Sequence, residues 1–127
     1  MEKILLFSDD EKLFEITKQV TEGKQELVWG NYQCLETNRY PFADVVIMHF
    51  DEDKIRKDIL QPIIKVKGRL GHLTPILAVI ENGSMQDIFS ILKIGVYDYI
   101  ETIDNTRKYK KKIENLNELQ KGASLSS

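Results

Sequence analysis

Acidic side chains and one histidine stand at the ends of short apolar runs, where they could bind a cation or accept a phosphoryl group. Ser8, Asp9 and Asp10 follow the first run, and His49 and Asp51 stand at the end of the third. Carboxylate oxygens are the ligands that Mg²⁺ prefers, whereas an imidazole suits transition metals. The sequence contains neither a glycine-rich phosphate-binding loop nor a G-x-S-x-G motif, so nucleotide-binding and serine-hydrolase chemistry are not indicated.

The position of these residues depends on five short apolar runs that alternate with segments of helical periodicity. A strand buried on both faces reads as a continuous apolar run, and such strands belong to parallel sheets covered by helices. Alternation with helices implies right-handed crossovers between parallel strands. The sequence therefore predicts an α/β fold with helices on both faces of the sheet. The expected strands are residues 4–7, 26–30, 44–50, 74–80 and 96–100.

Helical spacing of apolar residues fills the segments after these strands. Asp9 or Asp10 is a suitable N-cap for the first helix, and Ser84 is one for the fourth. Pro62 falls inside the third helical segment, where we expect a kink or two shorter helices. The expected helices are residues 10–21, 31–40, 51–69, 85–94 and 105–120, and residues 121–127 are expected to form a disordered tail.

Length and composition fit a single soluble domain. The chain has 127 residues, a net charge of −2 and a single cysteine, Cys34. One cysteine cannot form an internal disulfide and is typical of a reducing compartment. The first apolar run is shorter than the ~7–15 residues of a signal peptide, and no run approaches the ~20 residues that cross a bilayer. We therefore expect a cytoplasmic protein without membrane contact, and its balanced charge does not favour nucleic-acid binding.

Four segments in order resemble the receiver domains of two-component response regulators, and together they extend over residues 2–120. They are KILLFSDDE at residues 3–11, DVVIM at 44–48, TPILAV at 74–79 and GVYDYI at 95–100. The last is similar to the family's G-A-x-D-Y-I-x-K-P segment and is the most specific. The resemblance implies one flavodoxin-like (CheY-like) domain over residues 1–120, a three-layer sandwich with five parallel strands in the order 2-1-3-4-5, and a role in a signalling pathway or phosphorelay.

In receiver domains, two carboxylates after the first strand and an aspartate at the end of the third hold Mg²⁺, and that aspartate accepts the phosphoryl group. By resemblance, the carboxylate pair falls on Ser8 and Asp9, so that only one of the two is kept. The acceptor position falls on His49, whose imidazole cannot form an acyl phosphate and is a poor ligand for Mg²⁺.

The residues that contact a bound phosphoryl group in the family are also replaced. The threonine or serine after the fourth strand falls on Ile80, and the lysine after the fifth falls on Thr102. Ile80 has no hydroxyl to donate, and Thr102 carries no positive charge. Only the aromatic residue that changes position in active receivers is kept, as the switch aromatic Tyr99.

These replacements predict a degenerate receiver, or pseudo-receiver, that acts through protein–protein contacts without aspartyl phosphorylation, enzymatic activity or a cofactor. Asp51 is a candidate displaced acceptor, although it is better placed to cap the following helix. Two alternatives remain open: phosphorylation of Asp51 or Asp9 with Mg²⁺, and binding of a small molecule or metal at the former active site. For His49 the plainer interpretation is a hydrogen bond or ion pair with Asp9, which would let it respond to pH near neutrality.

The resemblance also implies a partner surface, because the fourth helix, fifth strand and fifth helix commonly mediate dimers or effector contacts in this family. The chain keeps the family's pattern in these elements, and a homodimer is one expected assembly. The basic run at residues 107–112 is interpreted as a solvated helix face. The candidate partner residues are Ile88, Phe89, Lys93, Tyr97, Tyr99, Tyr109 and Lys110.

Overall fold

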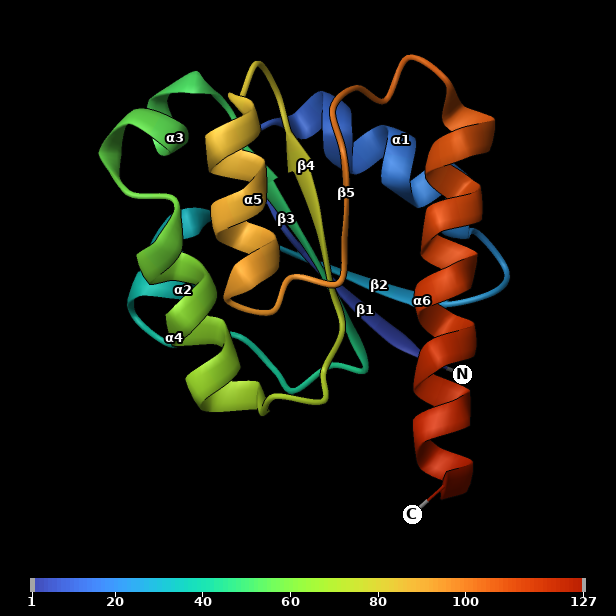
Figure 1. Cartoon of the computed structure of the whole chain (residues 1–127). Coiled ribbons are helices and arrows are strands. Elements are labelled where there is room, and N and C mark those ends of the chain that lie inside the picture. Colours follow the sequence, from blue (N-terminus) through green and yellow to red (C-terminus); the bar gives the residue numbers. More distant parts are fainter. Residues whose placement is uncertain (1, 127) are drawn as a thin grey trace.

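One parallel sheet of five strands forms the centre of the protein, with helices on both faces (Figure 1). The computed structural model describes the backbone of residues 2–126 and the side chains of residues 2–120. The strand order is β2-β1-β3-β4-β5, which confirms the expected fold. The elements are β1 (Lys3–Phe7), α1 (Glu11–Thr21), β2 (Glu26–Gly30), α2 (Tyr32–Glu36), β3 (Val45–Phe50), α3 (Glu52–Lys57), α4 (Leu60–Leu70), β4 (Ile76–Ile80), α5 (Met85–Lys93), β5 (Asp98–Ile100) and α6 (Thr106–Ser126).

Two apolar layers cover the sheet, one on each face. Helices α1 and α6 cover one face through side chains such as Leu13 and Leu116. Helices α2, α4 and α5 cover the other face, with Ile63 and Ile88 among the buried contacts. All residues of β3 and β4 are buried, so both faces of these strands need apolar side chains. This double burial explains why the sequence shows consecutive rather than alternating apolar positions there.

The helical segment after β3 is divided as expected, but the division does not occur at the proline. Helix α3 ends at Lys57 and α4 begins at Leu60. Asp58 separates them because its backbone is extended and its Oδ1 accepts hydrogen bonds from the amides of Leu60 and Gln61, at 2.9 and 3.1 Å. Pro62 lies in the first turn of α4, where a backbone nitrogen has no intrahelical partner to lose.

Other boundaries also differ from those expected from the sequence. Helix α2 contains only Tyr32–Glu36, β4 begins at Ile76 and not at residue 74, and β5 contains only Asp98–Ile100. Helix α6 continues to Ser126, although the sequence predicted an end at residue 120. The tail expected over residues 121–127 lies outside the residues whose side chains are described. Within residues 2–126, none of the helices combines the length and the apolar character needed to cross a membrane.

A buried hydrogen bond joins α1 to α6 across one face of the sheet. Thr17 Oγ1 lies 2.7 Å from the hydroxyl oxygen of Tyr109, and it also donates to the Leu13 carbonyl at 2.7 Å. Burial raises the pKa of Tyr109 far more than the Thr17 hydrogen bond lowers it, so its hydroxyl stays protonated. Tyr109 is therefore the donor in the contact between the two helices.

We predict that Tyr109→Phe lowers the free energy of unfolding by about 1 kcal/mol, because one buried hydrogen bond is lost while the ring keeps its packing. Urea unfolding followed by the fluorescence of Trp29, the single tryptophan, measures the change. Tyr97→Phe is the control, because Tyr97 is exposed, and it should change the free energy by less than about 0.5 kcal/mol. Equal losses in the two variants would contradict this role of Tyr109.

Candidate functional site

The carboxyl ends of the parallel strands meet at one edge of the sheet, and the residues expected to form a site lie there. Ser8 and Asp9 follow β1, His49 lies near the end of β3, Ile80 ends β4 and Thr102 follows β5. Because β1 and β3 are neighbours in the sheet, Ser8 and His49 come into direct contact. Sheets of this architecture bind their ligands at this edge.

His49 is almost completely buried, with 4% of its surface exposed, and it has a polar neighbour on each side. Its Nδ1 lies 2.9 Å from the Ser8 hydroxyl oxygen. Its Nε2 lies 3.4 Å from Glu81 Oε1, within ion-pair distance but not aligned for a hydrogen bond. The expected pairing with Asp9 does not form, because the Asp9 carboxylate is bound by other donors.

Ser8, His49 and Glu81 place a serine, a histidine and a carboxylate side by side, but the serine lies on Nδ1 and the carboxylate on Nε2, the reverse of a serine-hydrolase triad, and the arrangement is closed to a substrate. Ser8 is fully buried, and its hydroxyl oxygen also accepts a hydrogen bond from the Asp10 amide at 3.0 Å. The Ser8 carbonyl accepts the indole N–H of Trp29 at 2.8 Å. These contacts make Ser8 a structural link between β1 and β3, since a nucleophile must be open to its substrate.

Asp9 forms an ion pair with Lys54 of α3, a residue that the sequence did not single out. Asp9 Oδ2 lies 2.7 Å from Lys54 Nζ, and Asp9 Oδ1 accepts a hydrogen bond from the Tyr32 amide at 3.0 Å. Partial burial raises the pKa of Asp9, but Lys54 and the Tyr32 amide outweigh it and hold that pKa below its ordinary value. The hydrogen bond to Asp9 raises the pKa of Lys54 in return. An ammonium group therefore neutralises Asp9, the one residue of the pair named by the resemblance that is a carboxylate.

Tyr32 connects this ion pair to β3. Its hydroxyl donates a hydrogen bond to the His49 carbonyl at 2.5 Å, and Lys54 Nζ lies 5.0 Å from the centre of its ring. Burial, together with the charges of Asp9 and Asp51, raises the pKa of Tyr32 well above its ordinary value, so the hydroxyl remains a donor. One tyrosine and one lysine thus hold α2, α3 and β3 together at the strand ends.

Asp51, the candidate displaced acceptor, is the N-cap of α3. Its Oδ1 accepts a hydrogen bond from the Lys54 amide at 2.9 Å. Glu52 and Asp53 add negative charge to the first turn, where the helix dipole favours it. The carboxylate of Asp51 therefore stabilises the helix that brings Lys54 to Asp9.

Ile80 and Thr102 lie outside this network. Ile80 is fully buried, and a Cβ at Gly83 would come within 2.7 Å of Ile80 Cδ1, so the loop after β4 packs directly on it. Thr102 is exposed, and its Oγ1 accepts a hydrogen bond from the Asp104 amide at 3.1 Å. Tyr99 is half-buried against the apolar cluster on the α5 side of the sheet. Neither Ile80 nor Thr102 offers a positive charge to a phosphoryl group.

The donor set at this edge does not fit Mg²⁺. An octahedral Mg²⁺ site needs several free oxygen ligands, but Asp9 is bound to Lys54, Asp51 caps α3 and Ser8 contacts His49. Among the described residues, no three histidine, cysteine or carboxylate side chains are grouped as a metal site requires. The Lys54 ammonium supplies the positive charge beside Asp9 that the resemblance assigns to a metal ion.

A groove of about 640 Å³ opens beside the ion pair, between α2 and the α3–α4 segment. Lysines and carboxylates line it in equal numbers, so it favours neither an anion nor a cation. Its charged lining residues are Asp9, Glu36, Lys54, Lys57, Asp58 and Lys65.

The predicted partner surface is only partly exposed. Phe89 and Tyr97 are 64% and 52% exposed, and Lys93 is exposed as well. Ile88 is buried because it lies on the side of α5 that packs against the sheet, and Tyr109 is buried because it bonds to α1. These last two residues belong to the core, which corrects their assignment to a partner surface.

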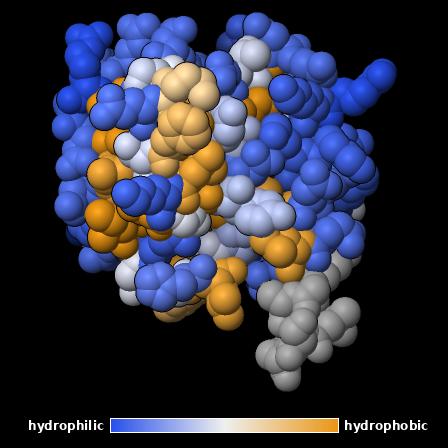
Figure 2. All heavy atoms as spheres, in the orientation of Figure 1, coloured by the Kyte–Doolittle hydropathy of each residue, from blue (hydrophilic) through white to orange (hydrophobic). Residues whose placement is uncertain are grey.

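The exposed part of this surface centres on α5. Figure 2 shows apolar side chains gathered over α5 on the face turned to the viewer. Met85 and Phe89 are exposed on this helix, one turn apart. Lys110 of α6 is half-buried. We define the α5 surface as Met85, Phe89, Lys93 and Tyr97.

Comparison with solved structures identifies the fold. A response regulator receiver domain protein from Clostridium thermocellum is similar with a TM-score of 0.76 and 16% identity, over 100% of both chains. The receiver domain of the Francisella response regulator 1452 gives a TM-score of 0.69 at 21% identity, covering 97% of this chain and 99% of that one. Full-length FixJ from B. japonicum gives a TM-score of 0.71 at 15% identity, covering 98% of this chain and 62% of FixJ. No protein-family model and no curated protein matches the sequence. The chain therefore has the fold of response regulator receiver domains.

We predict that Lys54→Met lowers the free energy of unfolding near neutral pH by about 0.5–1 kcal/mol, a small value because 43% of the Asp9 side chain is exposed to screening solvent. The pKa of Asp9 is lower in the folded chain than in the unfolded one, so ionised Asp9 stabilises the fold above the unfolded value. This contribution is lost as the pH falls through the folded value. The cost of the substitution should therefore shrink below about pH 4, as urea unfolding followed by Trp29 fluorescence will measure.

Lys57→Met is the matched control, because Lys57 is an exposed lysine on the same helix. It should change the free energy of unfolding by less than about 0.5 kcal/mol at every pH. A loss in Lys54→Met that stays constant across the pH range would show that the ion pair is not its source.

Proposed function

We propose that the protein is a non-enzymatic, cytoplasmic signalling module of the two-component type, which acts through protein–protein contacts and is not phosphorylated on aspartate. The observation that carries this proposal is the chemistry at the phosphoacceptor position, where His49 lies between Ser8 and Glu81. An imidazole cannot form an acyl phosphate. With 4% of its surface exposed, His49 is also closed to a phosphodonor.

The charges at the strand ends support the same conclusion. Phosphoryl transfer requires cations that offset the negative charge of the transferred group. Lys54 is already paired with Asp9. Ile80 and Thr102, the positions to which the resemblance assigns the phosphoryl contacts, add no positive charge, so like-charge repulsion from the carboxylates disfavours a phosphoryl group there.

A displaced acceptor is the alternative with an observation in its favour, since the Lys54 charge is felt by both Asp9 and Asp51. Asp51 is engaged as the N-cap of α3 through Oδ1. Asp9 is engaged at both oxygens, by Lys54 at Oδ2 and by the Tyr32 amide at Oδ1. Phosphorylation of either residue would require one of these contacts to rearrange.

Intact-mass spectrometry after incubation with acetyl phosphate and Mg²⁺ tests the proposal. We predict that no phosphoryl adduct forms, because the acceptor carboxylate, one of the two metal carboxylates and the charge-balancing lysine are replaced. Beryllium fluoride with Mg²⁺ should likewise leave the melting temperature unchanged, since a ligand that does not bind cannot stabilise the fold. An adduct that disappears in Asp51→Asn or in Asp9→Asn would establish the displaced acceptor and overturn the proposal.

A matched positive control restores the family's groups in this chain, through Ser8→Asp, His49→Asp, Ile80→Thr and Thr102→Lys together. This combined variant should form the adduct under the same conditions. His49→Asp alone should not, because the second metal carboxylate, the hydroxyl and the lysine are still missing.

The partner contact is proposed to lie on the α5 surface, and a second copy of the chain is the partner that can be tested directly. We predict self-association in sedimentation velocity at high protein concentration and its loss in Phe89→Asp, because a charge would be buried at the contact. Leu73→Asp is the control, since Leu73 is exposed elsewhere, between α4 and β4. A chain that stays monomeric without substitution would contradict the homodimer.

A further inference from the structure

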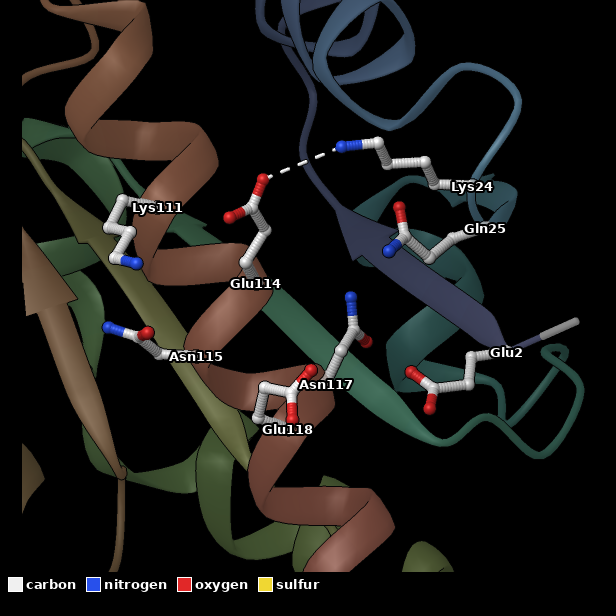
Figure 3. Close-up of a pocket in the computed structure, with 8 residues that line it drawn as sticks. All are labelled: Glu2, Lys24, Gln25, Lys111, Glu114, Asn115, Asn117 and Glu118. Atoms are coloured by element: carbon white, nitrogen blue, oxygen red, sulfur yellow. Dashed lines mark ion pairs between the residues drawn. The ribbon is translucent and has the colours of Figure 1, made fainter.

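A polar pocket of about 800 Å³ lies at the end of the sheet opposite the site described above (Figure 3). Its walls come from the residues that precede β1 and β2 and from the middle of α6, as Glu2, Gln25 and Asn117 show. Nothing in the proposed signalling function uses this end of the sheet. Ligand binding at this end would therefore be independent of that function.

The side chain of Asn117 is the unusual feature of this pocket. It is only 5% exposed, and neither its amide nitrogen nor its carbonyl oxygen has a hydrogen-bond partner among the described residues. Asn117 continues the buried stripe of α6 that Tyr109, Ile113 and Leu116 form, at a position where helical periodicity favours an apolar residue. A buried amide without a partner destabilises the fold.

The walls around Asn117 are held by contacts within the chain. Lys24 Nζ lies 3.7 Å from Glu114 Oε1 and spans the pocket from the β2 side to α6, as the dashed line in Figure 3 marks. The Glu26 amide donates to the Glu2 carbonyl at 2.8 Å and fixes the start of β1 against β2. Figure 3 shows the Asn117 side chain between α6 and β1, with Glu2 and Gln25 across the pocket. The opening is therefore preformed rather than dependent on a mobile segment.

We infer that this pocket binds a small, neutral, planar molecule that presents a hydrogen-bond donor beside an acceptor, and that the Asn117 carboxamide recognises it. A carboxamide offers a donor and an acceptor in one plane, so it pairs with the edge of a primary amide or of a nucleobase. Three carboxylates and two lysines line the pocket, a near balance of charge that favours a neutral ligand over an anion.

Three probes carry such an edge: benzamide, adenine and uracil. We expect at least one of them to shift the side-chain amide signals of Asn117 in ¹⁵N-correlated NMR spectra of the full chain. The shift should rise with probe concentration to a plateau. N,N-dimethylbenzamide is the matched control, because it keeps the ring and the carbonyl but has no donor, and it should cause no such shift. This comparison uses the unmodified chain, so its outcome does not depend on the folding of a variant.

Asn117→Leu tests the residue itself. It should weaken binding of the active probe by at least about tenfold, the effect of losing two hydrogen bonds, and it should unfold at a higher urea concentration because an unpartnered buried amide is removed. Gln86→Ala is the control, since Gln86 is an exposed amide side chain on α5, outside this pocket, and it should leave probe binding unchanged. Shifts by none of the three probes, equal shifts by the two benzamides, or binding that survives in Asn117→Leu would overturn the inference. Long-lived water at the Asn117 amide with no response to any probe would overturn it as well.

Discussion

The ion pair between Asp9 and Lys54 is the contact on which the strand ends depend. A parallel sheet that carries several carboxylates at one edge concentrates negative charge there, and that charge must be offset by a metal ion or removed. Two of the positions at which the resemblance to receiver domains places carboxylates hold Ser8 and His49, and Lys54 neutralises Asp9 at the third, at 2.7 Å. A side chain thus offsets the charge of Asp9.

This internal balance has a consequence for signalling by such a fold. A switch needs an interaction that is available in one state and absent from the other. Asp9 is held by Lys54 and the Tyr32 amide, and Asp51 is held by the first turn of α3. Tyr32 further ties the backbone of His49 to α2. Because these groups already have their partners, the network stabilises one arrangement of the strand ends. On the proposed function, the signal is therefore carried by the binding of a partner protein to the α5 surface.

Sequence reasoning reached the parts of this structure that depend on local pattern. Consecutive apolar residues identified the strands, because β3 and β4 are buried on both faces, and the capping role of Asp51 followed from its place before a helix. The role of Lys54 was not predicted, because its position depends on where α3 begins and on the break at Asp58 that separates α3 from α4. The contacts of His49 were not predicted for a related reason. Ser8 and Glu81 follow different strands, and only the register of the sheet brings each of them to His49.

The burial of Asn117 was not predicted either, although the helical spacing of α6 already indicated it. Tyr109, Ile113 and Asn117 follow one another at four-residue steps, which place Asn117 on the buried side of α6. A polar residue in a helix is nevertheless usually expected to face solvent. The two ends of the sheet then present opposite cases of one rule, that buried polar groups need partners. At the carboxyl end, Lys54 and the Tyr32 amide bind Asp9 and Ser8 bonds to His49 Nδ1, while His49 Nε2 has only the Glu81 carboxylate within ion-pair distance. At the amino end, the Asn117 carboxamide has no hydrogen-bond partner among the described residues, and on the inferred recognition of a planar amide edge the ligand itself would supply that partner.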